Sequence, residues 1–299
     1  MKTNILLILA ILCTLTASHA KENATTRIEH EKLQVEGWTV YVDKSFLEGE
    51  HKQSGDLVLR ILGERLHQIS LRLPAEPVAK MKEVPIYVDR AHPLGGAHYH
   101  PEADWLEERG YDPAMTKAVQ LTHAEGLIRE ASGPHSTSVL LHELAHAYHD
   151  RELGFDHPEI MAGYRKFCDS RKFDEVDLLS GRRKPHYGLT DHKEYFAEMT
   201  ETFFVGNSHY PFNHFQLYRQ HPESYELVAR IWGAKVSPPK TVENEQPNIL
   251  DLRIRAALKA QRGDLEGALK LIEQAEERSN DGEGRLEELR KRILSEHGQ

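Results

Sequence analysis

Cysteine is nearly absent from this chain, which has two cysteines among 299 residues. Cys13 lies in an apolar N-terminal segment, so Cys168 is the only cysteine in the rest of the chain. A single cysteine cannot close an internal disulfide. No histidine stands beside Cys168 at a spacing typical of a nucleophilic pair. The sequence therefore excludes a fold held by internal disulfides and argues against thiol catalysis.

An excess of positive charge is also missing. The chain has 38 lysines and arginines against 47 aspartates and glutamates, and its formal net charge is −9. Nucleic acids and anionic membranes attract basic surfaces, so we expect neither as a partner. Hydrophobic residues make up 39% of the chain, which is enough for a soluble globular protein with a buried core.

No apolar run is long enough to span a membrane comfortably. Residues 5–12 are apolar without interruption, but a bilayer core of roughly 30 Å needs about 20 such residues. Lys2 precedes this run, and Ser18 and Ala20 are small residues at −3 and −1 of a cut after Ala20. We therefore predict a signal peptide over residues 1–20. Export would end in the periplasm or outside the cell, with no stable membrane anchor after cleavage.

Three segments follow the predicted signal peptide. Residues 21–235 are predicted to form one domain, with mixed helices and strands first and helices from residue 136 onward. Within it the hydrophobic spacing predicts a helix over residues 56–73 and strands over residues 35–42, 84–88, 95–100 and 118–122. Prolines and polar residues predict a linker over residues 236–248. Residues 249–299 resemble one tetratricopeptide-like hairpin or triplet of helices, which either packs on the preceding domain or docks a protein partner.

The strongest chemical signal is a His-Glu-Leu-Ala-His sequence on a predicted helix that starts near Ser136 or Thr137 and ends at Gly154. His142 and His146 are four residues apart, so they share a helix face with Cβ atoms about 5–6 Å apart. Two imidazoles at this separation can bind one tetrahedral ion. Glu143 lies beside such an ion, where a general base takes a proton from bound water.

A zinc site of this kind needs a third protein ligand. Glu152 has the position used when a glycine breaks the helix, but His149 occupies the place of that glycine. Glu194 and Glu198 lie on one face of a later predicted helix. One of them would bind the metal, and the other would hydrogen-bond a ligand histidine. Spacing alone leaves Glu194, Glu198 and Asp191 as candidates.

Residues 187–198, together with residues 142–147, resemble the catalytic domain of the anthrax lethal factor family, a family of gluzincins. In that family a tyrosine precedes a zinc-binding glutamate by seven residues, within a Glu-aromatic-Phe-Ala-Glu helix. The resemblance implies that Glu194 is the third ligand to one Zn²⁺ ion. It also implies that Tyr187 stabilises the oxyanion of a tetrahedral intermediate. The other domains of the family have no room in this chain, so its toxin function is not implied.

Together these features predict an α+β, zincin-like domain. Its mixed sheet would carry an edge strand over the active-site helix, followed by a helical subdomain and the C-terminal α-helical hairpin. The expected function is that of a secreted zinc metallopeptidase, with Glu143 as general base and Glu198 as the outer hydrogen-bond partner. A peptide or protein substrate would lie along an edge strand within residues 95–106. A non-peptidase zinc hydrolase and a catalytically idle scaffold that binds a partner through its tail are the alternatives, and an intact Glu143 argues against the second.

Two other groups of residues are weaker candidates. His98 and His100 share a face of a predicted strand and could start a second metal site. No acidic or cysteine partner completes it, so we predict a role in the cleft or on the surface. The aromatic residues within 210–215 would either line a specificity pocket or pack beneath the site.

Overall fold

The computed structural model describes residues 28–131, 138–235, 249–278 and 285–296. The predicted signal peptide, the predicted helix start at Ser136 and Thr137, and the predicted linker over residues 236–248 lie outside these residues. The chain divides into two compact units, Met1–Ser237 and Pro238–Gln299. Each unit is described by itself.

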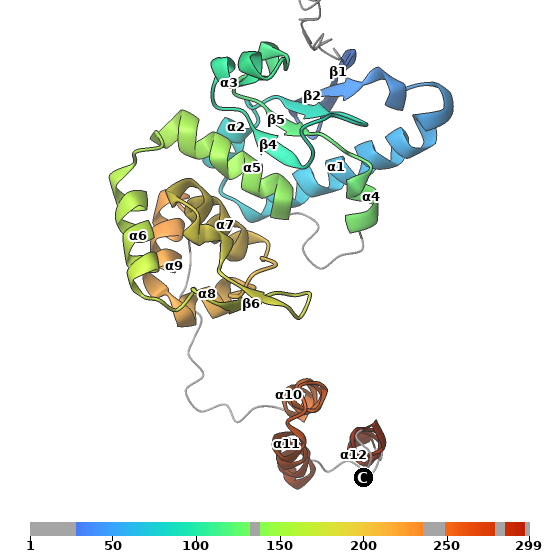
Figure 1. The fold of residues 1–299 in the computed structure, drawn as a ribbon, viewed down its shortest axis with the longest axis vertical. Coiled ribbons are helices and arrows are strands. Elements are labelled where there is room, and N and C mark those ends of the chain that lie inside the picture. Colours follow the sequence, from blue (N-terminus) through green and yellow to red (C-terminus); the bar gives the residue numbers. More distant parts are fainter. Residues whose placement is uncertain (1–27, 132–137, 236–248, 279–284, 297–299) are drawn as a thin grey trace, which may run out of the picture. The chain divides into compact units, whose positions relative to one another are not determined.

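A five-stranded mixed sheet organises the first unit, with the strand order β1-β2-β3-β5-β4 (Figure 1). The β1/β2 and β4/β5 pairs are antiparallel, and the β2/β3 and β3/β5 pairs are parallel. The strands are β1 (His30–Val35), β2 (Trp38–Asp43), β3 (Ile86–Val88), β4 (Ala97–Tyr99) and β5 (Val119–Leu121). A mixed sheet surrounded by helices confirms the α+β class, and β4 is an edge strand.

The prediction of one strand over residues 35–42 was wrong, because a tight turn divides this segment between β1 and β2. Glu36 has φ 51° and Gly37 has φ 87°. Two successive residues with positive φ match the turn that joins closely paired antiparallel strands. Beyond the turn the predicted alternation holds, since Trp38, Val40 and Val42 are fully buried. The other three predicted strands are confirmed in shortened form as β3, β4 and β5.

The two faces of the sheet are covered differently. On one face, α1 (Lys52–Arg72) and α5 (Ser138–Tyr148) share the main hydrophobic core with the inward side chains of β2. On the other face, Tyr41 and Tyr87 stack with ring centroids 4.8 Å apart, in a smaller cluster that includes Leu106 of α3 (Ala103–Glu108). Short helices α2 (Ala75–Met81) and α4 (Gly126–Glu130) complete this part. The helix predicted over residues 56–73 is confirmed as α1.

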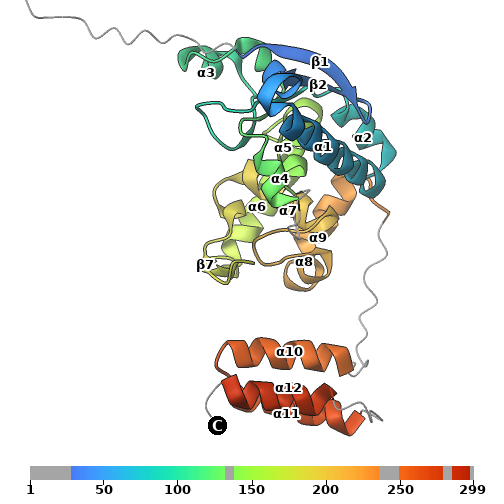
Figure 2. The ribbon, with the colours of Figure 1, turned by 90° about the vertical axis from the view of Figure 1, so that its right-hand side faces the viewer.

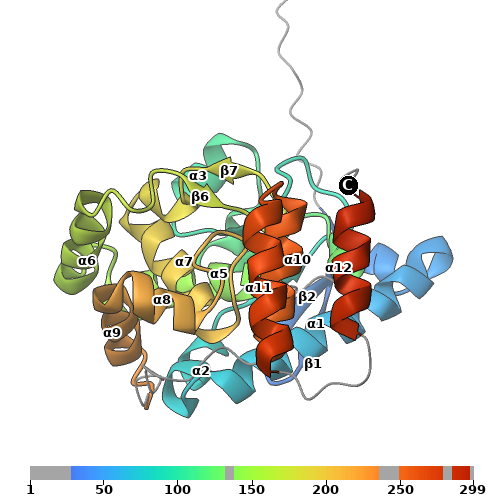
Figure 3. The ribbon, with the colours of Figure 1, turned by 90° about the horizontal axis from the view of Figure 1, so that it is seen from below.

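The remaining helices of the first unit surround α7 (His192–Phe204), and α5 lies between α7 and the sheet (Figures 1 and 3). Two buried hydrogen bonds fix α7 in place: Tyr195 and Ser224 share one of 2.6 Å, and the indole of Trp232 donates one of 3.0 Å to Thr200. The helices around α7 are α6 (Pro158–Asp169), α8 (His214–Gln220) and α9 (Pro222–Ile231). A two-stranded sheet of β6 (Val176–Asp177) and β7 (Arg183–Lys184) precedes α7 in the chain.

The second unit contains three described helices, α10 (Ile249–Gln261), α11 (Leu265–Arg278) and α12 (Arg285–Glu296) (Figure 2). Gly263, with φ 81°, lies in the turn between α10 and α11. Small and aliphatic side chains from all three helices form one buried cluster: Ala256, Ala260, Ala268, Ile272 and Ile293. The unit is therefore a triplet of helices. None of the helices described in either unit has the length and apolar character of a membrane span.

Candidate metal centre

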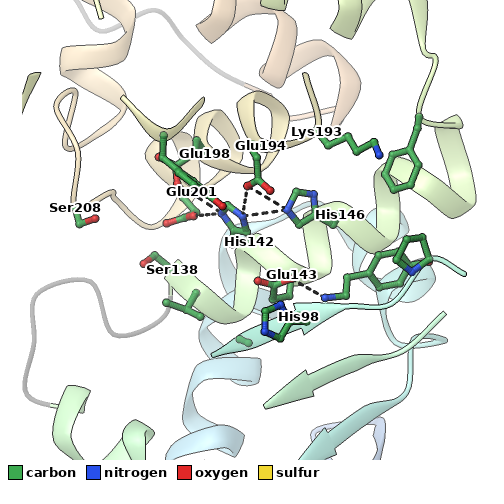
Figure 4. A pocket seen from close by; sticks show the side chains of 16 residues that line it. His98, Ser138, His142, Glu143, His146, Lys193, Glu194, Glu198, Glu201 and Ser208 are labelled. Atoms are coloured by element: carbon green, nitrogen blue, oxygen red, sulfur yellow. Dashed lines mark hydrogen bonds and ion pairs between the residues drawn. The ribbon is translucent and has the colours of Figure 1, made fainter. Parts of the chain in front are cut away.

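Helix α5 carries the His-Glu-Leu-Ala-His sequence, and its apolar residues determine how that sequence is presented. Leu140, Leu141, Leu144 and Ala145 are buried in the main core, which holds the helix between the sheet and α7. His142 and His146 therefore face α7 (Figure 4). The helix continues for one wider turn over His149–Leu153 and ends at Gly154, which has φ 78°. The predicted helix end is confirmed.

Helix α7 presents its carboxylates because Asp191 fixes its start. The Asp191 side chain accepts hydrogen bonds from the backbone N–H groups of Lys193 (2.8 Å) and Glu194 (2.9 Å). This is N-cap geometry, so Asp191 caps the helix and is not a metal ligand. From this start, Glu194, Glu198 and Glu201 follow at intervals of four and three residues and share one helix face.

Three donor atoms from α5 and α7 converge at one point. The Nε2 atoms of His142 and His146 lie 3.0 Å apart. Oε2 of Glu194 lies 3.0 Å from Nε2 of His142 and 3.5 Å from Nε2 of His146 (Figure 4). These three residues form a group that could hold a metal ion. Glu152 lies in the turn after α5 and pairs with Lys80 at 3.7 Å, so it takes no part.

The carboxylate that orients His142 is Glu201, which the sequence analysis did not single out. Nδ1 of His142 lies 2.5 Å from Oε1 of Glu201 in a buried hydrogen bond. The prediction that Glu198 makes this bond was wrong, since its nearest oxygen lies 3.7 Å from the same nitrogen. Glu198 instead accepts a hydrogen bond of 3.0 Å from the Asn207 amide. Glu201 is seven residues after Glu194, two helical turns along the same face, and that spacing was the signal available in the sequence.

His142 also belongs to a second group that could hold a metal ion, with Glu198 and Glu201 on its Nδ1 side. Burial, followed by the nearby charge of Glu201, raises the pKa of the Glu198 carboxyl to about 8. A carboxyl that keeps its proton at neutral pH is a poor metal ligand. In the first group, burial alone would raise the pKa of Glu194, but the hydrogen bonds with His142 and His146 hold it well below its ordinary value. The first group is therefore the better metal site.

Glu143 lies beside the converging donors and contacts the edge strand. Its Oε2 accepts a hydrogen bond of 2.7 Å from the backbone N–H of Tyr99, the last residue of β4. Burial raises the pKa of the Glu143 carboxyl, and the nearby His142 and His146 act in the opposite direction. A raised pKa brings a carboxylate closer to the range in which it can take up and return a proton at neutral pH.

Tyr187 borders the same site from the turn of 3₁₀ helix Tyr187–Leu189. Gly188 lets this turn approach α7 closely, because a Cβ atom there would lie 3.3 Å from the Cα atom of Tyr195. Tyr187 is 44% exposed, and its ring centroid lies 6.3 Å from that of His142. Burial and the charge of Glu194 raise the pKa of the phenol, so the hydroxyl keeps its proton and can donate a hydrogen bond.

These residues line one cavity of about 430 Å³. His98 lines it too, whereas His100 is buried and hydrogen-bonds Gln120 at 2.8 Å. In the described part of the chain, neither histidine belongs to a group that could hold a metal. None of residues 210–215 lines the cavity, so the predicted aromatic pocket is not part of it. Other lining residues were not foreseen from the sequence: Ser138, Val139, Phe155, Lys193, Glu201 and Ser208.

Comparisons with protein-family models, with curated proteins and with solved structures give no match for this chain. The resemblance to the lethal factor family therefore stays a prediction that rests on its motifs.

Proposed function

We propose that this protein is a secreted, zinc-dependent metallopeptidase with a zincin-like fold. The observation that carries the proposal is the convergence of His142, His146 and Glu194 next to a buried glutamate that contacts an edge strand. The secreted location rests on the signal peptide predicted over residues 1–20. The family proposal rests on the Tyr187–Glu198 sequence.

The donor set fits zinc. Zinc in proteins prefers four ligands in a tetrahedron, with bonds to nitrogen and oxygen of about 2.0–2.2 Å. Two such ligands lie roughly 3.3 Å apart in a tetrahedron of this size. The separations among His142, His146 and Glu194, from 3.0 to 3.5 Å, match that value. Two histidines and a glutamate also leave the fourth position open, as catalytic zinc sites do.

When bound, zinc supplies a Lewis acid that polarises a carbonyl oxygen and lowers the pKa of water. Glu143 takes the proton from the attacking water and then delivers it to the leaving amine. The Tyr99 N–H holds Oε2 of this carboxylate, so Oε1 is the oxygen available for the proton. Tyr187 donates its hydroxyl hydrogen to the oxyanion as negative charge develops there.

Glu201 prepares His142 for its role. The Glu201 carboxylate accepts a hydrogen bond from the Nδ1–H of His142, which keeps the proton on Nδ1 and leaves the Nε2 lone pair free to bind metal. Such outer partners orient the ring and make the imidazole a better ligand. This outer carboxylate supports a metal-binding role for His142 and argues against a chance pairing of two histidines.

The edge strand supports a peptide as substrate. The residues that flank β4 show which way it faces, since the His100 N–H donates to the Ala118 carbonyl just before β5, and the Gly96 carbonyl accepts from the Thr122 N–H just after β5. Because hydrogen-bonding directions alternate along a strand, Ala97 and Tyr99 turn their backbone groups toward the free edge. The Tyr99 N–H donates to Glu143, so the Ala97 N–H and the carbonyls of Ala97 and Tyr99 remain for a substrate. An extended peptide can pair with such an edge through its backbone. Its carbonyl would then lie beside Glu143.

The test is metal content and cleavage by the mature chain, residues 21–299, and by its Glu143→Gln variant. We expect one zinc ion per chain in both proteins. Cleavage of a denatured proteome digest should occur with the wild type alone and stop with a chelator. Loss of zinc from Glu143→Gln would show that Glu143 is a ligand. A zinc-loaded wild type that hydrolyses small esters and no peptide would be a non-peptidase hydrolase.

A further inference from the structure

Lys193 is a cation in an otherwise anionic cavity. Among the described residues that line the cavity, it is the only lysine or arginine, whereas four are glutamates. Figure 4 shows Lys193 on the same side of the cavity as His146. Within the part of the chain that the structure describes, its ammonium forms no ion pair with a carboxylate.

Neither helix electrostatics nor the proposed metal explains a lysine at this position. Lys193 is the second residue of α7, and positive charge near a helix N-terminus is electrostatically unfavourable. A metal dication bound by the adjacent Glu194 would repel it further. Glu194 itself interacts with His142 and His146, so it does not neutralise the lysine.

The position of the ammonium is nevertheless fixed. Its Nζ lies 4.5 Å from the ring centroid of Phe155, a cation–π contact. Phe155 follows Gly154, the residue that ends the wider turn after α5. The contact holds the lysine side chain against the segment after α5, and both residues line the cavity. The cavity therefore has a half-buried, oriented positive charge that no anion of the described chain satisfies.

The geometry points to Lys193 as a specificity-determining residue that binds a carboxylate of the substrate close to the scissile bond. The inference rests on the proposed peptidase function. Lys193 and the donor triad line the same cavity, so the carboxylate belongs to the short stretch of chain that fills it. Two sources share this chemistry: an aspartate or glutamate side chain, and the free C-terminal carboxylate of a peptide.

The experiment uses fluorogenic peptides with a neutral background and Asp or Asn at one position at a time. Each peptide is made with a free C-terminal carboxylate and with a C-terminal amide. We expect the wild type to cleave one carboxylate form about tenfold or more faster in kcat/KM than its matched amide form, as a hydrogen bond to a charged group allows. The position scan and the two termini distinguish the two sources.

Three variants test the residue. Lys193→Met should bring the carboxylate-to-amide ratio to about one. Lys166→Met removes the same charge from α6, at an exposed site outside the cavity, and should keep the wild-type ratio. Phe155→Leu keeps the lysine but removes the ring, so the ratio should fall part of the way. Zinc content and melting temperature are measured for each variant, and a fall in melting temperature of Lys193→Met with an unchanged ratio would leave Lys193 only a structural role.

Binding gives a second readout that does not need turnover. The labelled peptides are titrated into Glu143→Gln and into Glu143→Gln/Lys193→Met, and anisotropy is followed. Carboxylate-selective binding that depends on Lys193, without cleavage of any peptide by the wild type, would support this inference and contradict the peptidase. Cleavage with no carboxylate preference at any position would support the peptidase and contradict this inference. A protein that shows neither cleavage nor selective binding would contradict both the peptidase proposal and this inference.

Discussion

Helices α5 and α7 both contribute to the candidate metal centre, but they differ in how directly their sequences reveal it. On α5, His142 and His146 belong to a five-residue motif whose geometry follows from one turn of helix. On α7, Glu194, Glu198 and Glu201 are three carboxylates on one face, and all three line the same cavity. Their roles differ only through what surrounds each of them.

This difference shows that residue type says more about the role of the histidines, whereas the surroundings say more about the role of the carboxylates. A neutral imidazole binds metal wherever its lone pair is free, so the two histidines of α5 need little besides orientation. A carboxylate can bind metal, orient a ligand or keep its proton, depending on burial and neighbours. Glu194 contacts two histidines, Glu201 contacts one, and burial with a neighbouring charge keeps Glu198 protonated.

The largest expected effect comes from removing the metal ligand that we propose on α7. Glu194→Ala deletes one of three protein ligands, so metal affinity should fall by more than the 10–100-fold typical of losing an outer partner. Zinc stoichiometry by mass spectrometry or plasma emission measures this loss. Full zinc occupancy in Glu194→Ala would assign the ligand role to another carboxylate of α7.

Next in size is the effect of the phenol. Tyr187→Phe should keep zinc in place and lower kcat by about 10²–10³-fold, the range for loss of one oxyanion donor. Steady-state kinetics on one peptide, with zinc content as the control, give the answer. An unchanged kcat would remove Tyr187 from the mechanism and weaken the resemblance on which its role was predicted.

Substitutions of the two remaining carboxylates of α7 should differ clearly in their effect on zinc binding. Glu201→Gln replaces the hydrogen bond that orients His142 and should weaken zinc binding by about 10–100-fold. Glu198→Gln is the matched control, because a neutral amide resembles the protonated carboxyl that burial favours there. It should bind zinc within a few-fold of wild type. Competition titration with a fluorescent zinc chelator compares them, and a larger loss in Glu198→Gln would return the orienting role to that residue.

The smallest effect concerns His149, three residues after the motif of α5 and, among the described residues, outside both groups that could hold a metal. Burial lowers its pKa to about 3, against about 6.5 in an unfolded chain. Between these two pKa values the unfolded chain binds a proton at His149 and the folded chain does not. His149 therefore makes the free energy of unfolding fall as pH falls from 6.5. The slope is about 1.4 kcal/mol per pH unit at most.

His149→Leu should therefore lose less stability between pH 7 and pH 5 than the wild type does. Within the described chain, neither ring nitrogen of His149 has a hydrogen-bond partner, so the substitution should leave stability at pH 7 unchanged or slightly higher. Denaturant unfolding at several pH values measures the difference. Burial also lowers the pKa values of His186 and His209. Both residues are present in the variant as well as in the wild type, so only the change in the pH slope is diagnostic of His149.

Local spacing was enough to predict most of α5, and this has a physical reason. The motif, its apolar side and the stop at Gly154 all lie within a few helical turns. Glu201 was missed because its role depends on where α7 crosses α5. The contact between Lys193 and Phe155 was missed for the same reason, since 38 residues separate them and only packing brings them together.

The sheet shows the same limit at shorter range. Alternating residues predicted a strand that ran through the turn at Glu36 and Gly37. Either an unbroken strand or a hairpin satisfies this pattern, and the positive φ values decide between them. Pairing partners and the edge position of β4 depend on the strand order, which local periodicity does not contain.

The hydrogen bond between Glu143 and Tyr99 has a consequence for solubility. An exposed sheet edge is a template on which other chains can add strands and aggregate. Strand β4 is three residues long, and Glu143 accepts a hydrogen bond from the outward N–H of its last residue, so this donor is not offered to a strand of another copy. An amide at position 143 can keep the bond, whereas alanine cannot. Glu143→Ala should therefore aggregate more readily than Glu143→Gln, although both lack the same base.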